Sequence, residues 1–141
     1  MSDARHIPLS QDAALIVALA GTAIPFAHSA EDEAERWLRA LRLHGEVGRI
    51  MQALGVSESP LTDDPVSHET PPFSEQVLER VTRGAAAYTA ERGGDSVGTQ
   101  DLLRAVVEIY GKLFERVLYV RGTSARELIE HLGDPHPARS G

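Results

Sequence analysis

The sequence predicts an all-α protein in which two pseudo-repeats of about four helices each pack as one helical bundle. Three observations predict this fold. Apolar residues recur at spacings of three and four, which places them on one face of a helix. Serines and threonines stand where helices would begin, and glycines stand where they would end. The same order of caps, helices and glycine breaks occurs twice, about 65 residues apart, which is typical of a unit that buries its apolar face against a copy of itself.

The first repeat is expected over residues 9–56, after a flexible N-terminus at 1–8. Its second helix carries a predicted buried face formed by Trp37, Leu38 and Leu41. Side-chain oxygens of serines cap the predicted helix starts, and glycine or proline ends the helices. These caps and breaks follow in the order Ser10, Gly21, Pro25, Ser29, Gly45 and Gly55.

A proline-rich linker at residues 57–72 separates the repeats, because prolines remove backbone donors and no long helix can cross them. The second repeat is expected over 73–132, and a disordered tail over 133–141. Thr99 is the predicted N-cap of its second helix, with Asp101 in the first turn. The caps and breaks of this repeat follow the order Ser74, Gly93, Thr99, Gly111, Gly122 and Ser124.

The composition excludes several classes of protein. A chain of 141 residues with 42% hydrophobic residues can form one domain with a core. The net charge of −7 argues against nucleic acid or an anionic membrane as a partner. The absence of cysteine excludes disulfides and thiolate zinc sites, and it fits a reducing compartment. The apolar run 13–20 is too short to span a membrane, so we expect a cytoplasmic protein.

The turn Val97-Gly98-Thr99-Gln100-Asp101-Leu102-Leu103, together with the internal repeat, resembles the N-terminal repeat domain of Clp-type AAA+ unfoldases. Each pseudo-repeat of that family contains a helix, a turn of the type I/V-G-T-E-H, and then Leu-Leu. The resemblance covers about residues 9–132, and its closing helix includes the stretch RGTSARELIEHL. It implies an all-helical double repeat that binds proteins. Because the chain has no Walker-A pattern, it would be a stand-alone Clp N-like module and not the motor.

The resemblance implies peptide-binding positions in the turn of each repeat. In the second repeat these are Thr99, Gln100 and Asp101, and the matching residues of the first repeat are Glu35 and Arg36 within Ala34-Glu35-Arg36. In some relatives the Thr and Glu of this turn help to bind phosphoarginine. Gln100 lacks the carboxylate that would meet the guanidinium group, which argues against phosphoarginine as the ligand here.

Trp37 has two interpretations. It lies on the apolar face of a predicted helix, so it can be a core residue. If it is partly exposed where the repeats meet, it can instead anchor a bound peptide.

No set of residues predicts catalysis or metal binding. The serines are helix caps without a nucleophile motif, and the six histidines are scattered along the chain. The acidic residues at 31–35 begin a predicted helix, where they complement its dipole. We therefore expect no enzymatic activity, no cofactor and no metal.

Two functional hypotheses follow. In the first, the chain binds a Clp-type AAA+ ATPase or its client proteins and acts as an adaptor, decoy or regulator in protein quality control. In the second, it is a small all-α scaffold or oligomerisation module in an unrelated stress or signalling system. We expect a monomer or a weak homodimer.

Overall fold

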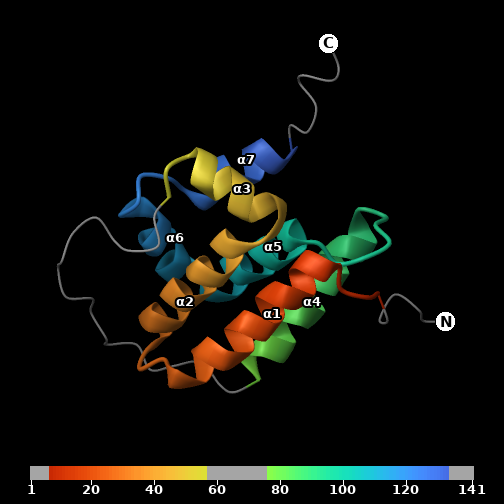
Figure 1. Cartoon of the computed structure of the whole chain (residues 1–141), viewed down its shortest axis with the longest axis horizontal. Helices are drawn as coiled ribbons and strands as arrows, with labels where there is room; N and C mark the ends of the chain where they lie inside the picture. The colour runs from red at the N-terminus through yellow and green to blue at the C-terminus, as the bar shows by residue number, and fades with distance from the viewer. Residues whose placement is uncertain (1–6, 57–75, 134–141) are drawn as a thin grey trace, which may run out of the picture.

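The computed structural model describes residues 7–56 and 76–133, and these residues form packed helices (Figure 1). A short 3-10 helix, η2 (Ile24–Phe26), follows the first α-helix. The α-helices are α1 (Gln11–Ala23), α2 (Ala30–Leu43), α3 (Gly45–Ala53), α4 (Val77–Glu91), α5 (Thr99–Tyr110), α6 (Lys112–Tyr119) and α7 (Ala125–Gly133). The predicted all-α class is confirmed. The predicted linker at 57–72 lies outside the described residues, as do 1–6 and 134–141 of the predicted terminal segments.

Three of the predicted serine caps are confirmed. The Ser10 hydroxyl accepts the Ala13 N–H at 3.1 Å, and the Ser29 hydroxyl accepts the Asp32 N–H at 3.1 Å. Ser124 caps the first turn of α7 by accepting the Glu127 N–H at 3.0 Å. Each cap supplies an acceptor to a backbone donor that has no partner within its helix. The predicted cap Ser74 lies outside the described ranges.

The prediction of Thr99 as an N-cap is wrong by one residue. Gly98 occupies the N-cap position of α5 with extended backbone, and Thr99 is the first helical residue. The Thr99 hydroxyl instead accepts the Val47 N–H at 3.3 Å and so connects α5 to α3. The carboxylate of Asp101 accepts the Gly98 N–H at 2.9 Å, so the acid three residues after the cap position completes this helix start.

The predicted glycine ends of α3, α4 and α6 are confirmed. Gly55, Gly93 and Gly122 have φ between 72° and 85°, a conformation that glycine adopts without strain. After each of them, the next residue's N–H bonds to a carbonyl five residues back, as in a Schellman motif. Gly45 and Gly111 also have positive φ; Gly45 is the first residue of α3, and Gly111 lies between α5 and α6.

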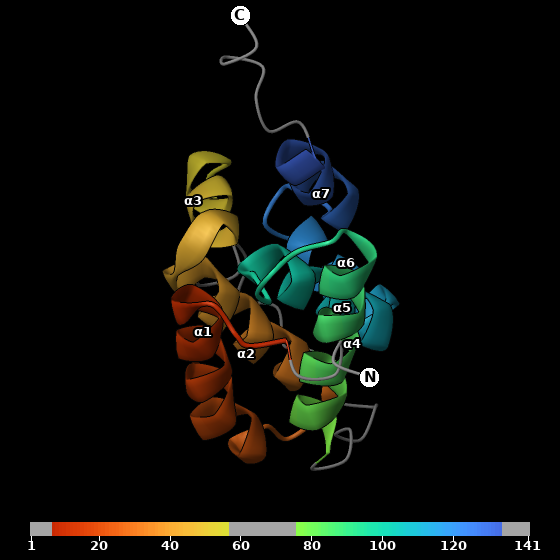
Figure 2. The ribbon, with the colours of Figure 1, turned by 90° about the vertical axis from the view of Figure 1, so that its right-hand side faces the viewer.

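Helix α2 is the central element of the core. It packs against α1, α3, α5 and α6, and its predicted apolar face at Trp37, Leu38 and Leu41 is fully buried. Figure 2 shows α1 and α4 at the front of the molecule, with α2 and α5 behind them. Because neighbours cover α2 on several sides, its glutamates Glu31, Glu33 and Glu35 are buried as well.

The residues just before α1 are fixed to the turn before α5. Val97 donates its N–H to the Pro8 carbonyl at 2.7 Å and accepts the Ser10 N–H at 2.9 Å. These bonds form a parallel bridge between Leu9 and Val97, and Ile7 packs against the core. The predicted flexible segment 1–8 therefore ends in two residues, Ile7 and Pro8, that contact the helical body.

Candidate functional site

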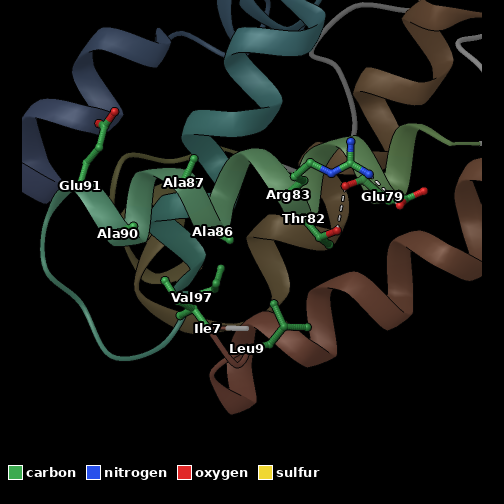
Figure 3. A pocket seen from close by; sticks show the side chains of 10 residues that line it. All are labelled: Ile7, Leu9, Glu79, Thr82, Arg83, Ala86, Ala87, Ala90, Glu91 and Val97. Atoms are coloured by element: carbon green, nitrogen blue, oxygen red, sulfur yellow. Dashed lines mark hydrogen bonds and ion pairs between the residues drawn. The ribbon is translucent and has the colours of Figure 1, made fainter. Parts of the chain in front are cut away.

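A groove of about 850 Å³ lies beside α4 (Figure 3). Its apolar lining comes from three segments that are distant in sequence: the stretch before α1, the outer side of α4 and the turn before α5. Figure 3 shows Ala86 and Ala90 on the side of α4 that faces Ile7, Leu9 and Val97. The lining residues are Ile7, Leu9, Glu79, Thr82, Arg83, Ala86, Ala87, Ala90, Glu91 and Val97.

Small side chains on α4 create the space of the groove. The opposite side of α4 buries Val77, Val81 and Ala85, which fixes the rotation of the helix. Alanines at 86 and 90 then line the groove, and their short side chains leave it open. The other wall is held in place by the backbone bridge between Leu9 and Val97. Both walls are therefore positioned by the fold and do not depend on a ligand.

Charged residues lie at the two ends of the groove (Figure 3). At one end Arg83 and Glu79 form an ion pair of 2.8 Å, and both side chains are largely exposed, so the pair adds little stability. The Thr82 hydroxyl donates to the Glu79 carbonyl at 3.0 Å. Glu91 lies at the other end. The groove thus has an apolar middle with a neutral ion pair at one end, whereas the Glu91 side chain at the other end points away from Ile7, Leu9 and Val97 (Figure 3).

A second, polar cavity of about 250 Å³ lies where the first turns of α1, α3 and α5 meet. Two residues of the predicted turn, Thr99 and Gln100, line it. The carboxylates of Asp12 and Glu46 stand at the positive ends of α1 and α3, where they complement the helix dipoles. The complete lining is Ser10, Asp12, Glu46, Arg49, Gly98, Thr99 and Gln100.

Asp101, the third residue of the predicted turn, is fully buried. Its carboxylate accepts hydrogen bonds from Arg92 at 2.7 and 3.0 Å and from the Thr89 hydroxyl at 2.7 Å, in addition to the Gly98 N–H. Burial alone would raise the pKa of Asp101, but these hydrogen bonds outweigh it and lower the pKa. The carboxylate therefore stabilises the connection between α4 and α5 through these hydrogen bonds.

Glu35 is buried in an ion pair between the two halves of the chain. Arg121, two residues after the end of α6, donates to the Glu35 carboxylate at 2.6 Å and to the Val117 carbonyl at 2.7 Å. The Arg121 side chain has no solvent exposure. Removal of one partner would leave a buried charge uncompensated, so this contact serves the fold.

Arg36 is bound by neighbours at the C-terminal side of α1. Its guanidinium pairs with Asp32 at 3.2 Å and donates to the Ala23 carbonyl at 3.0 Å. Burial raises the pKa of Asp32, but the hydrogen bonds from Arg36 and from the His28 N–H lower it overall.

Trp37 is a core residue, in agreement with the first of its two interpretations. It is fully buried, and its indole N–H donates to the Tyr110 hydroxyl at 3.1 Å. That hydroxyl in turn donates to the Glu33 carboxylate at 2.9 Å. Burial, followed by the charge of Glu33, raises the pKa of Tyr110 far above its usual value. The observed burial leaves no Trp37 surface for a peptide.

The structure does not place the two predicted turns in equivalent positions. Thr99, Gln100 and Asp101 form the first turn of α5, whereas Glu35 and Arg36 lie in the second turn of α2. The two repeats share a Leu-Arg-Ala segment at 38–40 and 103–105, which begins at the ninth residue of α2 but at the fifth residue of α5. Because Ser29 caps α2 early, the residues matched to the turn fall inside the helix.

The groove was not among the sites predicted from the sequence. Ala85 is buried, and a Cβ at Gly84 would lie 3.4 Å from that of Ala105, so this side of α4 packs closely on α5. Ala86 and Ala87, however, line the groove. The available signal was Ile7 and Leu9, two large apolar residues in an otherwise polar leading segment.

Comparisons with known proteins assign no family. No protein-family model matches the chain, and no curated protein is significantly similar to it. None of the helices in the described ranges is long and apolar enough to cross a membrane. Within the same ranges, no group of three or more histidine or acidic side chains is placed to hold a metal ion.

Proposed function

We propose that this chain is a protein-binding module of the Clp N-terminal repeat type. It takes an apolar polypeptide segment in the groove beside α4, and it acts as an adaptor, decoy or regulator in Clp-type AAA+ protein quality control. The observation that carries the binding proposal is the groove itself, whose apolar middle is lined by α4 on one side and by the bridged segments at Leu9 and Val97 on the other. Such a cavity suits a partner whose apolar side chains leave water on binding.

The helix pairing supports the double-repeat part of the proposal. Helix α1 packs on α2 as α4 packs on α5, and α2 packs on α6 as α5 packs on α3. The positive φ values of Gly45 and Gly111 fall at the same point of each half, and so do those of Gly55 and Gly122. A duplicated unit would produce this correspondence.

The groove favours an occupant with small or medium apolar side chains and one basic residue. Alanines and the side chains of Ile7, Leu9 and Val97 offer apolar contact, and the exposed Glu91 lies on α4 at one end of the groove. The net charge of −7 also favours a neutral or basic segment. Exposed apolar stretches of unfolded clients, with a lysine or arginine beside them, have this character.

The test compares two matched variants. Ala90 and Ala53 are both exposed alanines in the last turn of a helix, but only Ala90 lines the groove. A labelled peptide with an apolar stretch and one lysine is titrated with protein, and its fluorescence anisotropy is followed. We expect Ala90→Arg to weaken binding by at least about tenfold, because it fills the groove and repels the lysine, and Ala53→Arg to bind like the wild type.

Equal binding by both variants would show that the groove is not the site. The Clp assignment is tested separately, by co-purification with the Clp-type ATPase of the source organism and with an unfolded model client. If the wild-type protein retains neither, the proposed role in Clp-type quality control is wrong.

A further inference from the structure

The stretch before α1 has one hydrogen-bonded edge and one free edge. In the bridge to Val97, the bonding groups are the Pro8 carbonyl, at 2.7 Å, and the Ser10 N–H, at 2.9 Å. Successive residues of an extended chain direct their backbone groups to opposite sides, so those of Leu9 point away from Val97. Within the part of the chain that the structure describes, the Leu9 N–H and carbonyl bond to no other residue.

Ile7 continues the free edge. A residue before proline favours extended backbone, and residues two apart direct their backbone groups to the same side, so Ile7 and Leu9 share an edge. Among the described residues, neither the N–H nor the carbonyl of Ile7 has a partner. Pro8 lacks an N–H, but its position faces Val97, so the missing donor does not interrupt the free edge. We call the backbone groups of Ile7 and Leu9 the outer edge.

The side chains of this short pairing lie over the groove. Directly paired residues place their side chains on the same face, and so do residues two apart on one strand. Ile7, Leu9 and Val97 therefore share one face, and that face lines the groove opposite the alanines of α4 (Figure 3). A further strand beside the outer edge would extend this face, and every second side chain of that strand would point into the groove.

We propose that the partner segment binds as an extended strand on the outer edge, with apolar side chains at alternate positions in the groove. This inference rests on the proposed function, because it specifies the conformation of the segment that the groove takes. The free backbone groups favour a strand over a helix. A helix uses its own N–H and carbonyl groups internally and has none left for the outer edge, whereas an extended chain offers one set along each side.

A second copy of this chain fits the outer edge less well. Two copies paired through their outer edges would each keep Ile7 and Leu9 over their own groove, so neither groove would receive a side chain. Both copies also carry a net charge of −7, which opposes their approach. A partner strand brings side chains of its own, so it satisfies the outer edge and fills the groove together.

Two labelled peptides of identical composition test the conformation of the bound segment. Both contain leucine and glutamine in equal numbers and one lysine. One peptide has leucine at every second position, and the other has leucine at the helical spacings of three and four. Fluorescence anisotropy with the full chain should show at least about tenfold tighter binding of the alternating peptide. Equal binding, or tighter binding of the helical pattern, would overturn the proposal.

N-methylation of the alternating peptide, one residue at a time, measures the backbone pairing directly. Each N-methyl group removes one peptide N–H. At every second residue, where the N–H faces the outer edge, methylation should weaken binding by at least about fivefold, which corresponds to one hydrogen bond. At the residues between, the change should stay below about twofold. A scan without this alternation would overturn the proposal.

Leu9→Pro and Leu9→Ala are the matched variants of the protein. Both remove the leucine side chain, but only Leu9→Pro also removes an N–H of the outer edge. The bonds that Val97 makes to Pro8 and Ser10 keep their donors and acceptors in both variants. Leu9→Pro should bind the alternating peptide at least about fivefold more weakly than Leu9→Ala, and equal binding would overturn the proposal. Circular dichroism confirms folding; if Leu9→Pro is unfolded, the N-methyl scan decides, because it uses the wild type.

The outcomes separate this inference from the proposed function. If Ala90→Arg abolishes binding but the N-methyl scan shows no alternation, the groove is the site and the strand pairing is wrong. If the wild type binds neither peptide, both proposals fail. A wild-type dimer in sedimentation velocity that Leu9→Pro dissociates and Leu9→Ala does not would place a second copy on the outer edge, and it would also overturn the proposal.

Discussion

Removal of one hydroxyl, in Tyr110→Phe, tests whether the Trp37–Tyr110–Glu33 chain holds the two halves together. The substitution deletes the hydrogen bond from the Trp37 indole at 3.1 Å and the bond to the Glu33 carboxylate at 2.9 Å. A buried neutral hydrogen bond contributes about 1 kcal/mol and one to a charged group about 2 kcal/mol. We therefore expect the free energy of unfolding to fall by about 3 kcal/mol, with a Tm about 10 °C lower.

Urea unfolding, followed by far-ultraviolet circular dichroism and by the fluorescence of Trp37, the single tryptophan, measures this change. Tyr119→Phe is the matched control, because Tyr119 is 79% exposed, and it should stay within about 0.5 kcal/mol of the wild type. A loss below about 1 kcal/mol for Tyr110→Phe would refute the reasoning, because the hydrogen bonds would then add no net stability.

The same tyrosine predicts a dependence on alkaline pH. Burial and the Glu33 charge raise the pKa of Tyr110 in the folded state, whereas an unfolded tyrosine titrates near 10. The stability that comes from the protonated hydroxyl is therefore present below about pH 10 and lost as the pH rises further. Between pH 10 and 11, the difference in the free energy of unfolding between the wild type and Tyr110→Phe should shrink by up to about 1.4 kcal/mol.

Two further predictions concern the connections between helices. Asp101→Asn should lower stability by about 2 kcal/mol at pH 7, because the buried carboxylate loses its charge-assisted hydrogen bonds from Arg92, Thr89 and the Gly98 N–H. Since the folded pKa of Asp101 is lowered, that contribution is present above about pH 4 and lost below it, so urea unfolding at pH 3 should show a smaller difference. Gly45→Ala and Gly55→Ala both place a side chain at φ of 82°, at a cost of about 1 kcal/mol each. Only Gly45→Ala brings its Cβ to within 2.5 Å of the Thr99 methyl. In thermal unfolding, Gly45→Ala should therefore be less stable than Gly55→Ala by at least about 1 kcal/mol. Equal losses of stability in the two variants would contradict the close approach of α3 and α5.

The helices could be predicted from the sequence because their signals are local. Ser10 and Ser29 each accept a hydrogen bond from a backbone N–H three residues away. Gly55 ends α3 through bonds to carbonyls within five residues. Such contacts depend on neighbouring residues alone, so a sequence pattern contains the information. Thr99 was misplaced because its hydroxyl bonds to Val47, on another helix, which no local pattern reveals.

The burial of the acidic residues could not be predicted. Glu33 and Glu35 were interpreted as acids that complement the dipole of a helix start, which is correct for an exposed helix. They are buried because α2 lies between other helices, and their partners Tyr110 and Arg121 belong to the other half of the chain. The groove escaped prediction for the same reason, because it is assembled from segments on either side of α4 that only the fold brings together.

The hydrogen bonds of α2 have a consequence for how the chain folds. Trp37–Tyr110, Glu33–Tyr110 and Glu35–Arg121 join residues 73, 77 and 86 positions apart. A fragment ending at residue 56 would keep the buried acids of α2 but lack Tyr110 and Arg121, and the fragment that begins at residue 57 would have the opposite deficit. Neither fragment should therefore fold alone. A mixture of the two fragments should bind each other and regain helix. In the intact chain, amide hydrogen exchange should report the same opening free energy in α2 and α5, because one global transition exposes both.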